Sequence, residues 1–201
     1  MTELTYDARP LTHRRLSGWE LLAVGLGTGL ISGVVMAAPL VIWDWVRTGH
    51  RALELPMAAT SWLFGLRHFS HTGNLAWPIL VGVALLCAYW IVSGISFTAL
   101  ADRVFAVEGP LASTAAGLAW GFVDFVFFWY MLLPIARNGV PFRVAPGDAG
   151  LFVAPNWVWI LGFTLLGLAS GLCYAALRGP TRQEEMTEDR GRTRRPLRHA
   201  A

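Results

Sequence analysis

The chain has 201 residues, of which 55% are hydrophobic and only 14% are charged. Soluble domains carry about 25% charged residues, so the composition excludes an ordinary soluble domain and indicates a bilayer protein. The formal net charge is +3, and because the excess arginine lies in the C-terminal tail, it concerns membrane topology rather than nucleic-acid binding. Arginine without any lysine is typical of GC-rich bacterial genomes, which suggests a bacterial source.

Four stretches are apolar over about the 20 residues that a membrane-spanning helix needs. Tryptophans fall near their ends, where an aromatic belt belongs. We therefore expect an all-α polytopic membrane protein, with residues 19–178 forming a four-transmembrane-helix bundle. The predicted spans are residues 21–46, 77–100, 112–135 and 157–177.

Arginine placement predicts the orientation. Because the number of predicted spans is even, residues 1–18 and 179–201 lie on the same side of the membrane. The segments on that side hold more arginines than the outer loops. Under the positive-inside rule both termini are cytoplasmic and the protein lies in the bacterial inner membrane. Residues 179–201 contain almost no apolar residues, so we expect a disordered basic tail. This tail either sets topology as a solvated segment or binds anionic lipid or a partner.

Small residues recur every four positions in three of the predicted spans, a glycine-zipper pattern. In a bilayer such positions let helix backbones approach closely. We expect a compact bundle, with the lipid bilayer as its surroundings and self-association or other membrane subunits as further contacts. The packing glycines are Gly25, Gly29 and Gly33 in the first span, Gly117 and Gly121 in the third, and Gly167 and Gly171 in the fourth.

Asp124 lies within the apolar stretch "GLAWGFVDFVFFWYMLLP" of the third span. It follows Gly121 by three residues and Gly117 by seven, which places all three on one helix face. The carboxyl is therefore expected to point inward, protonated and neutral, toward donors on other helices, for which Tyr89, Ser93 and Thr164 are the candidates. An acid in this setting is either a proton or cation site or interhelical hydrogen-bonding glue.

The first outer loop has a second helical pattern. Apolar residues from Leu55 to Phe69 fall at helical spacing, with Thr60, Arg67 and His71 on the opposite face. This pattern predicts a short interfacial helix.

His68 and His71 are three residues apart in this loop, and with His50 and Asp44 they form a weak candidate metal site. Metal sites need three or four converging ligands, and the spacing secures only two. Interfacial histidines are the alternative, and pairing with Arg47 is a simpler role for Asp44. No cofactor is predicted, although metal or haem at the histidines stays open.

The segment "AWPILVGVALL" from Ala76 matches "NWVWILGFTLL" from Asn156 at four positions in constant register. This match suggests a duplication of two helix pairs with the same orientation. The matched positions are Trp77, Gly82, Leu85 and Leu86 with Trp157, Gly162, Leu165 and Leu166.

Residues 100–179 combine an aromatic helix ending in "LLP" at Pro134, an "NGVPF" turn and a last helix opening on Trp157. With these features, the segment resembles small bacterial inner-membrane proteins of the YagU/YqhR kind. The resemblance implies a four-span membrane protein and brings no catalytic or binding residues.

The sequence has no HExxH, Walker, G-x-S-x-G or Rossmann motif, and no histidine falls within the four spans. We therefore expect a non-catalytic protein, an accessory or scaffolding subunit of a membrane complex. One alternative is a small permease or proton-coupled transporter that uses Asp124. A weaker one is a membrane oxidoreductase subunit that binds metal, haem or quinone near His68 and His71.

Overall fold

The computed structural model describes residues 15–48, 55–57, 59–60, 76–132 and 154–178. This part of the chain is about 92% helical and has no strand. Four helical stretches are long and apolar enough to cross a membrane, which confirms the predicted all-α bundle and indicates a multi-pass membrane protein. The elements are α1 (Gly18–Thr48), α3 (Ala76–Ala99), the π-helical turn η2 (Leu100–Val104), α4 (Pro110–Phe127), the π-helical turn η3 (Phe128–Leu132) and α6 (Asn156–Arg178).

Helix α1 begins at a capping box. The Ser17 backbone N–H donates to Glu20 Oε2 at 2.8 Å, and the Glu20 N–H donates to Ser17 Oγ at 3.3 Å. These reciprocal bonds satisfy amide groups that a helix start leaves unpaired. The helix is 31 residues long, or about 46 Å at 1.5 Å per residue, so it exceeds the hydrocarbon core of a bilayer at one or both ends.

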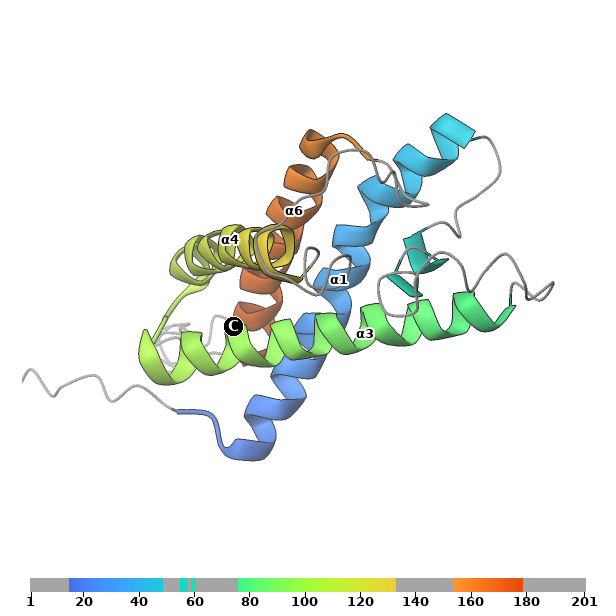
Figure 1. Ribbon diagram of the computed structural model, residues 1–201. Helices are drawn as coiled ribbons and strands as arrows, with labels where there is room; N and C mark the ends of the chain where they lie inside the picture. Colours follow the sequence, from blue (N-terminus) through green and yellow to red (C-terminus); the bar gives the residue numbers. More distant parts are fainter. Residues whose placement is uncertain (1–14, 49–54, 58, 61–75, 133–153, 179–201) are drawn as a thin grey trace, which may run out of the picture.

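The helices pack in the order α3, α1, α6, α4. Extensive contacts join α3 to α1, α1 to α6 and α6 to α4, whereas α3 approaches α4 and α6 only sparsely. Figure 1 shows α1 and α6 side by side, with α3 crossing α1 and α4 lying on the other side of α6. The backbones of α3 and α4 therefore do not meet closely.

Helices α1 and α3 cross at glycines. A Cβ atom at Gly25 would lie 2.7 Å from Ile95 Cα, and one at Gly29 would collide with the Trp90 carbonyl oxygen. Gly33 faces the Trp90 ring. The predicted glycines of the first span thus do contact another helix. On α3, the contacting glycine is Gly94, which packs on the Gly25 carbonyl and the Gly29 backbone. Sequence analysis assigned no packing glycine to this second span.

Helices α4 and α6 cross in the same manner. Gly117 lies against the Gly167 carbonyl and the Gly171 backbone, and a Cβ at Gly121 would lie 2.9 Å from Gly167 Cα. All four glycines predicted for the third and fourth spans therefore share one interface. Close backbone approach of this kind is how helices associate where lipid supplies no hydrophobic driving force.

One end of the bundle, called here the Leu16 end, is tied together by two long-range hydrogen bonds. The Leu16 N–H donates to Asp102 Oδ2 at 3.1 Å, and Arg178 Nη1 donates to the Val107 carbonyl oxygen at 2.5 Å. The start of α1, the α3–α4 connection and the end of α6 thereby meet. The opposite end, where α6 begins at Asn156, is called the Trp157 end.

Residues 55–57 and 59–60 are helical and pack into the bundle. Leu55 and Ala59 are buried, and Gly82 of α3 faces the Pro56 carbonyl oxygen. Thr60 is also buried and donates its hydroxyl hydrogen to the carbonyl oxygens of Pro56 and Pro78. The expectation that Thr60 lies on an outward polar face is therefore wrong. Trp62, Leu66, Arg67 and Phe69 of the predicted interfacial helix lie outside the described residues.

Candidate functional site

Asp124 lies on the inner face of α4. The buried residues of this helix are Ser113, Gly117, Gly121 and Asp124, which follow one another at the three- and four-residue spacing of a single helix face. The side chain is only 5% exposed. The residues that bring α4 against α6 therefore also turn the carboxyl away from lipid.

Both oxygens of the Asp124 carboxyl contact hydroxyl groups of α3. The Tyr89 hydroxyl oxygen lies within hydrogen-bond distance of Oδ1, at 2.9 Å, and the Ser93 hydroxyl donates to Oδ2 at 2.7 Å. Trp120, one turn before Asp124 on α4, donates its indole Nε1–H to Ser93 Oγ at 3.1 Å. We call these four residues the Asp124 cluster. It is a connected network in which two residues of α3 bond two residues of α4.

The Asp124 cluster lies between α3 and α4, two helices whose backbones meet only sparsely. Neither Tyr89 nor Trp120 is small, so the hydrogen bonds are made across a wider gap than at the glycine crossings. Hydrogen bonds between polar side chains therefore join α3 to α4 in place of close backbone packing. Such bonds between helices help to hold a bundle together in a bilayer.

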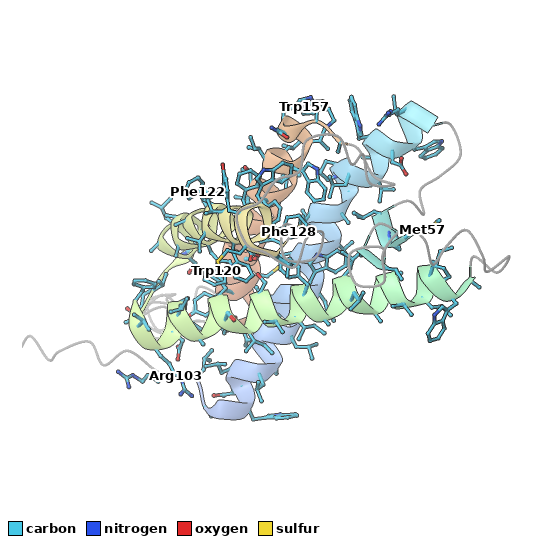
Figure 2. The ribbon with its side chains drawn as sticks, in the orientation of Figure 1. Met57, Arg103, Trp120, Phe122, Phe128 and Trp157 are labelled. Atoms are coloured by element: carbon cyan, nitrogen blue, oxygen red, sulfur yellow. The ribbon has the colours of Figure 1, made fainter. Side chains whose placement is uncertain are left out.

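Aromatic rings separate the Asp124 cluster from the Leu16 end. The Phe97 ring centroid lies 6.3 Å from that of Trp120 and 5.9 Å from that of Tyr174. Tyr174 is fully buried and lies beneath the Arg178 guanidinium, 5.8 Å from the ring centroid. Figure 2 shows Trp120 and Phe128 on the side of α4 that faces the other helices, with Phe122 turned away from them.

Toward the Trp157 end, the Asp124 cluster adjoins a small apolar cavity of about 10 Å³, which is room for about one water molecule. Tyr89 belongs both to this cavity lining and to the cluster, and Phe128 contacts the Tyr89 ring at 5.9 Å. The remaining lining residues are Met36, Ala37, Leu40, Leu55, Leu86, Trp90 and Trp159.

The structure brings together two of the three predicted donors. Tyr89 and Ser93 contact Asp124, but Thr164 is exposed on α6 and donates its hydroxyl hydrogen to the Ile160 carbonyl of its own helix at 2.7 Å. Thr164 is therefore not part of the cluster. Trp120 is the member that sequence analysis missed, although its position four residues before Asp124 places it on the same helix face.

A second buried acid was also missed. Asp102 has 0% exposure and lies in the π-helical turn η2, where it accepts the Leu16 N–H. The signal was its position in the apolar run "ISFTALADRVF". The structure assigns it a place at the Leu16 end, in contact with the start of α1.

The candidate metal ligands remain apart from this site. His50, His68 and His71 lie outside the described residues, and Asp44 is buried near the end of α1, with 4% of its surface exposed. Within residues 15–48, 55–60 (without 58), 76–132 and 154–178, no three His, Cys, Asp or Glu side chains converge on one point. The metal or haem site near the histidines stays a prediction.

No protein-family model, curated protein or solved structure matches the chain.

Proposed function

We propose that the protein is a non-catalytic integral membrane protein that serves as an accessory or scaffolding subunit of a membrane complex. The observation that supports this most is the use made of Asp124. Its two carboxyl oxygens are taken up by Tyr89 and Ser93, so the acid joins α3 to α4 within one chain. The adjoining cavity has room for about one water, which fits a joint between helices better than a solute site.

We place this protein in a bacterial inner membrane with both termini in the cytoplasm. The arginine distribution supports that orientation. Contacts at the Leu16 end between the start of α1, the α3–α4 connection and the end of α6 agree with an even number of crossings. Membership of the YagU/YqhR kind of membrane protein is part of the same proposal, and the basic tail at residues 179–201 is proposed to contact anionic lipid.

Purification in mild detergent tests the accessory role. The tagged full-length chain is extracted from its native membranes, with an unrelated tagged four-span protein as control. We expect a second membrane protein to co-migrate in stoichiometric amount with this chain and not with the control, and tagging that protein should recover this chain. A monodisperse single species would contradict the proposal.

A small permease or proton-coupled transporter is the second candidate. It is favoured by the position of Asp124 between α3 and α4, whose backbones meet only sparsely, next to a cavity. In liposomes, Asp124→Asn should abolish solute-coupled proton flux, whereas Val123→Ala on the exposed face of α4 should preserve it. Equal flux through both variants would exclude the transporter. The oxidoreductase alternative depends on His68 and His71, and a visible spectrum with metal analysis of the pure protein tests it.

A further inference from the structure

Trp120 fixes the direction of the hydrogen bonds at one end of the Asp124 cluster. An indole N–H can only donate, so Ser93 Oγ accepts the hydrogen bond from Trp120 Nε1. Ser93 has a single hydroxyl hydrogen, and the 2.7 Å contact with Asp124 Oδ2 uses it. In this arrangement Oδ2 accepts, which leaves Oδ1 as the oxygen that can carry a carboxyl proton.

The second oxygen, Oδ1, faces the Tyr89 hydroxyl at 2.9 Å. A tyrosine hydroxyl both donates and accepts, so this contact has two possible directions. If the carboxyl is ionised, Tyr89 donates to Oδ1. If the carboxyl is protonated on Oδ1, the acid donates to the Tyr89 oxygen and the phenol hydrogen turns away from Asp124.

The surroundings of Asp124 decide between these states. The side chain is buried, its two hydrogen-bond partners are neutral hydroxyls, and in the described part of the chain neither an arginine nor a histidine bonds it. A carboxylate that is removed from water without a cation is strongly disfavoured. On the helices around it, the other acidic and basic side chains lie toward the helix ends: Glu20, Asp44, Arg47, Asp102, Arg103 and Arg178.

We propose that Asp124 is a proton-binding site, which holds a proton on Oδ1 at neutral pH and donates it to the Tyr89 hydroxyl. Ser93 and Trp120 keep Oδ2 as the acceptor, so the proton has one position. Tyr89 also lines the water-sized cavity beside the cluster. The inference depends on the helices spanning a bilayer and not on any partner of the protein.

Infrared spectroscopy of the full-length protein in lipid vesicles at neutral pH tests the protonation state. In the difference between wild type and Asp124→Asn, we expect a protonated-carboxyl C=O stretching band that shifts in D₂O. Asp44 and Asp102 are present in both proteins, so their bands cancel. Asparagine can accept from Ser93 and donate to Tyr89, so this variant keeps the hydrogen-bond pattern. A difference spectrum with carboxylate bands instead would overturn the proposal.

A second pair of variants tests the role of Tyr89. In Tyr89→Phe the carboxyl O–H loses its acceptor, so the Asp124 band should move to higher frequency. Tyr130→Phe removes an exposed hydroxyl from the same bundle and should leave the band in place. A band that stays unmoved in Tyr89→Phe would show that the proton is not directed to Tyr89.

Discussion

At the scale of single residues, the Asp124 carboxyl forms hydrogen bonds with two hydroxyl groups of α3. Asp124→Ala removes the carboxyl that hydrogen-bonds the hydroxyls of Tyr89 and Ser93, and each buried polar group left without its partner costs about 1–3 kcal/mol. We therefore expect a loss of a few kcal/mol in the free energy of unfolding, measured by denaturant titration in detergent micelles. Val123→Ala, next to Asp124 but 51% exposed, is the matched control and should lose less than 1 kcal/mol. Equal losses would mean that the cluster contributes nothing to stability.

A second prediction concerns Ala106, which has a φ angle of 47° in the α3–α4 connection. Positive φ costs a non-glycine residue about 1–2 kcal/mol, so Ala106→Gly should raise the free energy of unfolding by up to about 1 kcal/mol after the entropy that glycine adds to the unfolded chain. Ala112→Gly, in the exposed first turns of α4, should lower it by about 0.5–1 kcal/mol. Two changes of the same sign would contradict this account.

The sequence predicted the inward direction of Asp124 because helical periodicity relates residues within one helix. It could not choose among the donors, since Tyr89 and Ser93 are 35 and 31 residues away along the chain and the register between two helices is a tertiary property. Thr164 was a reasonable candidate by depth, but its hydroxyl finds a carbonyl within its own helix, as threonine in a helix commonly does.

At the scale of helices, the glycine crossings carry the packing of α4 on α6. Gly117→Val would push side-chain atoms into the Gly167 carbonyl and the Gly171 backbone. Overpacking of this kind costs about 1–3 kcal/mol or more. We expect Gly117→Val to lower the thermal unfolding midpoint in detergent clearly, whereas Ala119→Val, two residues on and exposed, should change it little. If the Gly117→Val and Ala119→Val proteins were equally stable, the close packing of α4 on α6 at Gly117 would be contradicted.

Periodic glycines predicted which helix faces are close-packed, but not which helices they face. The spacing of Gly117 and Gly121 is the same as that of Gly25 and Gly29, yet the first pair meets α6 and the second meets α3. The single Gly94 has no glycine partner at four-residue spacing, so it gave no signal. The suggested duplication stays a prediction, although both matched glycines, Gly82 and Gly162, face backbone carbonyls, of Pro56 and Met36.

At the scale of the whole molecule, the contacts at the Leu16 end predict the sidedness of the chain. With Cys87 and Cys173 replaced by alanine, single cysteines at Gly18 and Glu108 should react with a membrane-impermeant maleimide from one side of the membrane. A cysteine at Asn156, at the Trp157 end, should react from the other side. The measurement uses sealed right-side-out and inverted vesicles. Labelling of positions 18 and 108 from opposite sides would contradict the bundle.

The packing order α3, α1, α6, α4 has a consequence for synthesis at the ribosome. Helix α3 can dock on α1 as soon as both have entered the membrane, because their glycine crossing is then complete. Helix α4 enters the membrane before α6 has been translated. The glycines of α4 therefore have no helix to pack against until the last segment of the nascent chain is made. During that interval Tyr89 and Ser93 are already in place, and Asp124 finds hydrogen-bonding partners in the half-finished protein.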